Sequence, residues 1–173
     1  MVFSYYKKLS RTQQRIYRES DKIVSVMLND VRPAHAVVKT LNAALKAANR
    51  VYTEKACRRL GQALADDLKI RRFNVRVLAA RPHDNYGELH GTYEPRYGTA
   101  PAKITLWMRT ARQKRVVAFR TFLRTFLHEF CHHLDYELFK LADSFHTEGF
   151  FKRESSLFHQ LLPARKLPRV NEQ

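Results

Sequence analysis

The sequence predicts an α+β fold: N-terminal helices, a three-stranded antiparallel sheet, a long helix that carries a histidine motif, and a C-terminal helix. Three observations predict this order. Apolar residues recur at helical spacing in the first part of the chain, alternate with polar residues in its middle, and return to helical spacing from about residue 116. With 173 residues, the chain is long enough to bury one core, so we expect one main domain.

The first part of the chain has the pattern of three helices. Residues 10–30 form the first amphipathic stretch, which Pro33 interrupts. Two further apolar stripes cover 37–48 and 56–68, and Thr53 is the expected cap of the last helix. Because these stripes have the width of a buried helix face, we expect them to form core.

Three strands are expected in the middle of the chain, at 73–80, 88–95 and 103–108. Apolar and polar residues alternate in "FNVRVLAA" and "KITLWM", and Pro95 closes the segment between them. Turn-like segments, "RPHDNYG" and "RYGTAP", separate the three. The strands should therefore follow one another as an antiparallel meander.

The C-terminal part returns to helices. A long one is expected from about 116 to 141, then the break "LADSF", then a shorter amphipathic helix from about Phe150 to Leu161. The chain thus divides into a helical extension (1–35), a main domain (36–163) and a basic tail (164–173).

Charge and cysteine content bear on partners and location. The net charge of +16 implies attraction to polyanions, most often nucleic acid. Cys57 and Cys131 are too few for a disulfide framework and are expected to be free, buried and reduced. The sequence has neither a signal-peptide pattern nor an apolar run of membrane-spanning length. We expect a cytoplasmic protein, with association with the nucleoid as a further possibility.

The stretch "HEFCH" (128–132) carries the strongest chemical signal. His128 and His132 lie four residues apart, so on a helix both imidazoles reach one ion. Neutral imidazole is a preferred ligand of Zn²⁺. Glu129, next to the first ligand, is placed to accept a proton from a water molecule.

A catalytic zinc usually has three protein ligands and one open position. His146, just after the break, is the expected third ligand, and Glu148 and Glu154 are the alternatives. The open fourth position favours a catalytic zinc over a structural one.

Other residues near the motif have simpler interpretations. His133 points about 100° away from His132 around the helix and is expected at the surface. Asp135 and Tyr136 are either hydrogen-bond partners of a ligand imidazole or solvated helix residues. Cys131 lies on another helical face. The remaining histidines lack convergent spacing and are expected to be structural: His35, His83, His90 and His159.

At this point the chain resembles the SprT-like zinc metalloproteases, the family that includes Spartan, over roughly residues 40–160. "HEFCH" matches their HExxH, "HTEGF" (146–150) resembles their HGxxF element, and "GELHGTYEPR…ITLWM" resembles their G-x-Y strand and the strand after it. Two departures are that Thr147 replaces the usual glycine and that the chain has no CxxC…CxxC zinc ribbon.

The resemblance implies a minimal zincin fold and a zinc-dependent protease acting on proteins associated with or crosslinked to DNA. His128, His132 and His146 would hold Zn²⁺ and Glu129 would be the catalytic base. A protein or peptide substrate would pair with the edge of the third strand. Two alternatives stay open: a zinc protease with no link to DNA, and a zinc-containing nucleic-acid-binding module without protease activity.

Basic residues concentrate before the HExxH helix. No acidic residue lies between Glu94 and Glu129, and DNA contact is expected from Arg109, Arg112, Lys114 and Arg115. Tyr97 and Trp107 either stack on bases or pack within the protein. The sequence indicates no oligomeric state.

Overall fold

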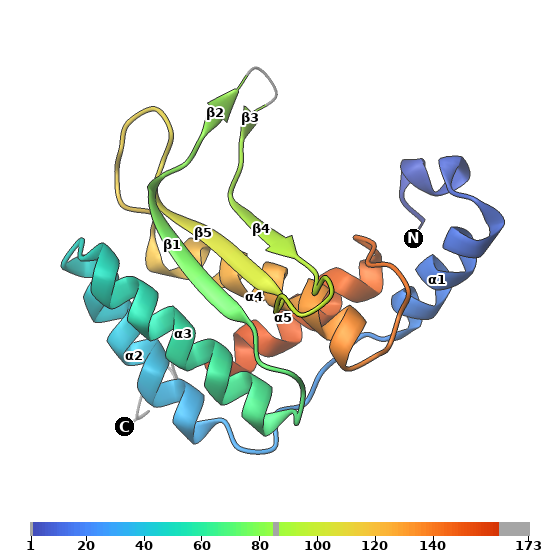
Figure 1. The fold of residues 1–173 in the computed structure, drawn as a ribbon, viewed down its shortest axis with the longest axis horizontal. Coiled ribbons are helices and arrows are strands. Elements are labelled where there is room, and N and C mark those ends of the chain that lie inside the picture. Colours follow the sequence, from blue (N-terminus) through green and yellow to red (C-terminus); the bar gives the residue numbers. More distant parts are fainter. Residues whose placement is uncertain (1, 85–86, 163–173) are drawn as a thin grey trace, which may run out of the picture.

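The computed structural model describes residues 2–84 and 87–162 (Figure 1). Its helices are η1 (Ser4–Lys8, a 3-10 helix), α1 (Arg11–Lys22), α2 (Arg32–Lys46), α3 (Arg50–Asp67), α4 (Phe119–Glu137) and α5 (Glu148–Leu161). Its strands are β1 (Asn74–Ala80), β2 (His83–Asp84), β3 (Gly87–Glu88), β4 (Gly91–Glu94) and β5 (Lys103–Arg109). The expected α+β class is confirmed, and the predicted basic tail lies outside the described residues.

The three-stranded sheet is mixed, so the prediction of an antiparallel meander is wrong. Its strand order is β1-β5-β4, with β5 parallel to β1 and antiparallel to β4. The last strand therefore inserts between the other two. The burial of β5 is consistent with its central position in the sheet. Five consecutive residues, Ile104 to Met108, are buried, which is typical of a central strand. The segment expected as one strand at 88–95 forms β3 and β4, and β3 pairs with β2 instead.

The two outer edges of this sheet differ. On β1, the Val75 and Val77 carbonyls accept hydrogen bonds from the Arg58 and Arg50 side chains of α3, and the Val77 N–H donates to Glu54. Side chains of α3 thus occupy the β1 edge. The expected substrate edge on the third strand does not exist, because β5 is paired on both sides. The edge beside the histidine helix belongs to β4.

Helices and sheet share one core. In Figure 1, α2 and α3 run side by side along β1, while α4 lies behind β5 and β4. Apolar side chains of β1 and β5 meet those of α3 and α4 in a single cluster that includes Val75, Val77, Leu60, Leu64, Ile104, Leu106, Met108, Phe122, Phe126 and Phe130. The helical stripes predicted from the sequence contribute to this core.

The first helix is shorter than predicted: α1 ends at Lys22, where residues 10–30 were expected to be helical. Beyond it, Val26 and Leu28 are buried while Met27 is exposed, so the chain alternates as an extended segment. The Asp67 carboxylate accepts hydrogen bonds from the Asn29 and Asp30 N–H groups, at 2.8 Å each. These tertiary contacts override the local helical pattern.

Smaller expectations have mixed outcomes. The N-cap of α3 is Asn49 rather than Thr53, and its side chain accepts a hydrogen bond from the Tyr52 N–H. Cys57 and Cys131 are free and buried, as expected. Across residues 2–84 and 87–162, no helix combines the length and the apolar character needed to cross a membrane.

Candidate metal centre

Helix α4 and the segment after it bring the three predicted histidines together. His128 and His132 occupy successive turns of α4. Lys140, in the left-handed region at φ 55°, follows the end of that helix, and the chain turns back. Thr147 then caps α5, its hydroxyl accepting a hydrogen bond from the Phe150 N–H at 2.9 Å. At φ −95° the backbone of Thr147 lies outside the left-handed region, so this position needs no glycine.

The Nε2 atoms of the three histidines converge. His146 Nε2 lies 3.0 Å from His128 Nε2 and 3.1 Å from His132 Nε2. The three side chains offer ligand atoms that all lie within 4.8 Å of one another. A zinc ion bound tetrahedrally at 2.0–2.1 Å from imidazole nitrogens sets those nitrogens about 3.3 Å apart. The spacing therefore fits a single small divalent cation.

Hydrogen bonds at the opposite ring nitrogens fix the direction of the lone pairs. His128 Nδ1 donates to the Glu154 carboxylate at 3.0 Å. The Ser144 hydroxyl donates its proton to Asp135 Oδ2, so its oxygen accepts a hydrogen bond from His132 Nδ1 at 2.7 Å. Both Nε2 atoms then carry lone pairs that point at His146. A cation between them replaces this repulsion with coordination.

Two of the three histidines, His132 and His146, have lowered pKa values, which favours the neutral ring that a metal ligand needs. Burial, together with the His146 and His128 rings, lowers the pKa of His132 to about 3. Burial likewise lowers the pKa of His146. At neutral pH no proton has to leave these two rings before a metal binds.

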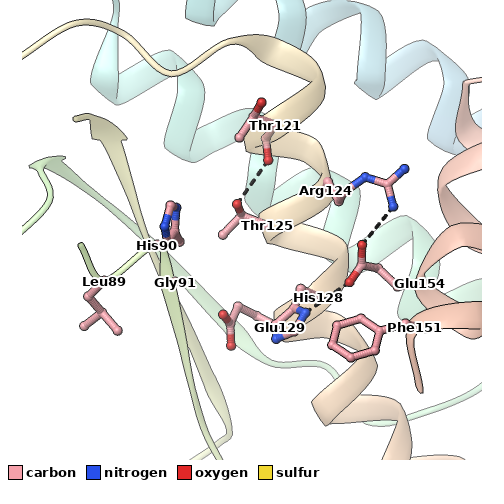
Figure 2. Close-up of a pocket in the computed structure, with 10 residues that line it drawn as sticks. All are labelled: Leu89, His90, Gly91, Thr121, Arg124, Thr125, His128, Glu129, Phe151 and Glu154. Carbon is pink, nitrogen blue, oxygen red and sulfur yellow. Dashed lines mark hydrogen bonds and ion pairs between the residues drawn. The ribbon is translucent and has the colours of Figure 1, made fainter. Parts of the chain in front are cut away.

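Glu129 lies beside the histidines at a pocket of about 580 Å³ (Figure 2). Burial raises the pKa of its carboxyl to about 7. A Cβ atom at Gly91 would lie 2.7 Å from Glu129 Oε1, so β4 approaches this carboxylate closely enough to require glycine there. The pocket is lined by Leu89, His90, Gly91, Thr121, Arg124, Thr125, His128, Glu129, Phe151 and Glu154.

Glu154, the alternative third ligand, takes a different place. Its Oε2 accepts the bond from His128 Nδ1, and its Oε1 accepts from Arg124 at 3.0 Å (Figure 2). It therefore contacts the ring edge that faces away from the converging Nε2 atoms. This geometry makes Glu154 the partner that orients His128 and leaves the third ligand position to His146. Glu148 lies outside the cluster that joins the three histidines.

Asp135 is fully buried, which removes the solvated alternative for this residue. Its Oδ2 accepts from Ser144, and its Oδ1 accepts from the fully buried Arg153 at 2.7 Å. It thus orients His132 through one hydroxyl. Neither Ser144 nor Arg153 was expected from the sequence, where a serine in a break between helices carries no distinctive signal. Tyr136 stacks on Tyr93 at 6.0 Å.

The expectation that His133 lies at the surface is wrong. Its ring is fully buried. Nε2 donates to the Arg71 carbonyl at 2.8 Å, so Nδ1 accepts from the Tyr93 hydroxyl at 3.1 Å. The G-x-Y segment of β4 is thereby explained: Gly91 makes room for Glu129, and Tyr93 fixes the helix that carries the ligands.

The basic and aromatic residues expected to contact DNA are not among those that line the pocket beside Glu129. Arg112, Lys114 and Arg115 are exposed in the loop before α4, and Arg109 donates to the Lys114 carbonyl at 2.9 Å. Tyr97 is 88% exposed, whereas Trp107 is buried and packs within the protein.

Among the remaining histidines, His35 Nε2 lies 2.7 Å from the Gln160 carbonyl, a structural role. His90 lines the pocket beside Glu129, which sequence spacing did not indicate. The side chain of His83 is outside the described part of the chain.

No protein-family model, curated protein or solved structure matches this chain.

Proposed function

We propose that this protein is a zinc-dependent metallopeptidase of the SprT-like kind, with a minimal zincin fold, that hydrolyses peptide bonds in DNA-associated proteins. The observation that carries the proposal is the convergence of three Nε2 atoms beside the Glu129 carboxylate and an open pocket. Structural zinc sites are normally closed by four protein ligands and rich in cysteine. Three histidines with an adjacent carboxylate favour catalysis instead.

His128, His132 and His146 would hold the metal. The chemistry that zinc supplies when bound is Lewis acidity, which polarises a carbonyl and lowers the pKa of water. Glu129 accepts a proton from the attacking water and returns it to the leaving amine. Glu154 and Ser144 keep the two helical ligands in their tautomers through the Nδ1 hydrogen bonds.

The substrate pairs as an added strand with β4. This edge lies beside Glu129, whereas side chains of α3 occupy the edge of β1. An extended peptide on β4 places a scissile bond over the histidines, and the neighbouring pocket receives one of its side chains. Leu89 and Phe151 give that pocket apolar walls.

The decisive experiment is cleavage of casein and of a DNA-bound protein by wild type and Glu129→Gln. Because a general base contributes about 10²–10⁴-fold, we expect at least about a 100-fold loss of rate with zinc content retained. Glu137→Gln is the matched control, since Glu137 lies on the same helix in 3.9 Å ion pairs with Arg71 and Lys140. Undiminished cleavage by Glu129→Gln contradicts the mechanism.

The second candidate function is a zinc-containing nucleic-acid-binding module without protease activity. The exposed basic loop at Arg112, Lys114 and Arg115 favours it. Salt-sensitive DNA binding by a wild type that cleaves no protein, with or without DNA, would select this function.

A further inference from the structure

The N-terminal arm, residues 3–23, reaches the metal centre although it lies outside the segment that carries the catalytic pattern. In Figure 1, α1 lies beside the loop that precedes α5. The Tyr5 hydroxyl donates a hydrogen bond to the carbonyl oxygen of His146 at 2.8 Å. Burial raises the pKa of Tyr5 to about 12, so this hydroxyl keeps its proton. The arm thus holds the backbone of the third ligand directly.

A second contact holds the start of α5. The Gly149 N–H donates to Asp21 Oδ1 at 2.9 Å. A Cβ atom at Gly149 would meet the Asp21 backbone, with its carbonyl carbon only 2.7 Å away. Gly149 is therefore required by the close approach of α1. Its hydrogen bond to Asp21 fixes the start of α5, three residues after His146.

A third contact runs through buried charges to the second ligand. Arg153 donates to the Ser20 and Ile23 carbonyls at 2.7 Å each, and to Asp135 at 2.7 Å. Asp135 in turn accepts from Ser144, the acceptor for His132 Nδ1. One side chain on α5 thereby connects the end of α1 with a ligand imidazole.

Aromatic packing adds to these polar contacts. The Phe3 ring meets Phe151 edge-on at 6.0 Å, and Phe151 stacks on His146 at 5.9 Å. Tyr17, fully buried, packs against Phe145 at 6.2 Å. Both the arm and α5 therefore pack against the loop of the third ligand, while His146 itself stays exposed.

We infer that the N-terminal arm is a positioning element of the metal centre, in which Tyr5 and Asp21 hold His146 in the geometry that binds zinc. This inference rests on the proposed zinc site. Groups that orient ligands typically change metal affinity by about 10–100-fold when removed, because a ligand loop that must be ordered on binding reduces the affinity. Loss of either contact should therefore weaken zinc binding without unfolding the chain.

The test is the affinity for Zn²⁺, measured by competition with a chromogenic chelator on the full chain. We expect Tyr5→Phe to weaken zinc binding about 10-fold while the melting temperature of the apoprotein stays near that of wild type, since the ring is kept. Tyr6→Phe is the matched control: it removes the neighbouring hydroxyl and keeps the ring that packs on Tyr17 at 5.0 Å. Its affinity should stay within about 2-fold of wild type.

Variants of Asp21 provide a second, independent test. Asp21→Ala should weaken Zn²⁺ binding about 10-fold, and Asp21→Asn, which keeps the acceptor oxygen, should restore it. The absorption spectrum of the Co²⁺-substituted protein should change in Asp21→Ala and match wild type in Asp21→Asn.

Equal zinc affinities in wild type, Tyr5→Phe and Asp21→Ala would overturn the inference, and so would equal losses in Tyr5→Phe and Tyr6→Phe. Peptide cleavage is scored separately from binding. A wild type that binds zinc through the arm-dependent site but cleaves nothing refutes the proposed peptidase and leaves the inference standing. A wild type that binds no zinc refutes both.

Discussion

At the scale of single residues, the neighbouring histidines His132 and His133 on α4 have different contacts. His132 directs Nε2 toward the other ligands, whereas His133 is buried between the Arg71 carbonyl and Tyr93. A rotation of about 100° per helical residue separates the two directions. One histidine belongs to the proposed metal centre, and the next contacts Tyr93 of β4 and so joins α4 to that strand.

This division makes a testable prediction for His133→Ala. The buried His133 ring leaves a cavity, and the Arg71 carbonyl and the Tyr93 hydroxyl lose a hydrogen-bond partner, so the free energy of unfolding should fall by about 2–4 kcal/mol. Zinc content should stay at the wild-type value. Urea denaturation with metal analysis checks both, and His159→Ala, at an exposed position, is the matched control. Loss of zinc from His133→Ala with unchanged stability would contradict the assignment.

The sequence predicts the clustering of the histidines better than it predicts their hydrogen-bond partners. The pairing of His128 with His132 follows from helical spacing, because local geometry alone determines which residues share a face. Ser144 and Tyr93 depend on contacts between segments far apart in the chain, and no local pattern encodes them. His133 was misassigned for the same reason: helical geometry gives its direction but not what covers it.

At the scale of elements, the approach of β4 to α4 determines the surroundings of Glu129. A Cβ at Gly91 would lie 2.7 Å from Glu129 Oε1 and 2.9 Å from Thr125 Cγ2. Two residues after Gly91, the Tyr93 hydroxyl forms a hydrogen bond with His133 of α4, which holds the strand close to the helix. Glycine at position 91 thus lets the edge of β4 lie directly beside the Glu129 carboxylate.

Gly91→Ala should displace Glu129 or β4. Because a shift of about 1 Å in a catalytic group costs about 100-fold, we expect that loss in kcat/KM with zinc content unchanged. Thr92→Ala is the control, since neighbouring strand residues point to opposite faces. Steady-state peptide cleavage measures the effect, and wild-type rates in Gly91→Ala would show that β4 does not border the reacting groups.

The strand order could not be predicted from the same segments. Three short strands with turn-like connections fit a meander as well as they fit β1-β5-β4. The distinguishing signal was the nearly continuous apolar run in β5, which marks a strand covered on both faces. Helix positions were easier to predict, although the first helix is shorter than its pattern, and the backbone beyond it donates tertiary hydrogen bonds to the Asp67 carboxylate.

At the scale of the whole molecule, the basic residues behind the net charge of +16 differ in their surroundings. Many basic side chains are engaged within the protein: Arg153 is fully buried against Asp135, and Arg58 and Arg72 pair with Glu54 and Asp66. The loop before α4 instead exposes its cations to solvent. We propose this loop as the part of the surface that contacts DNA.

Replacing Arg112, Lys114 and Arg115 together by Gln should weaken duplex DNA binding and reduce its salt dependence. Each phosphate contact contributes about 0.9 to the slope of log K against log salt, so the slope should fall by up to about 2.7. Fluorescence anisotropy across salt concentrations measures this. Gln at Lys46, Lys55 and Arg59, exposed on α2 and α3, makes the same change in net charge. Equal effects of both triple variants would assign binding to net charge alone.

The most direct test of the three-histidine centre is metal content by mass spectrometry, on purified wild type beside His146→Ala and His159→Ala. We predict one zinc per chain in wild type and His159→Ala, and loss of most of it in His146→Ala, because two helical ligands alone leave the site incomplete. A wild type that takes up no zinc after reconstitution, or a His146→Ala variant that retains it fully, would contradict the account.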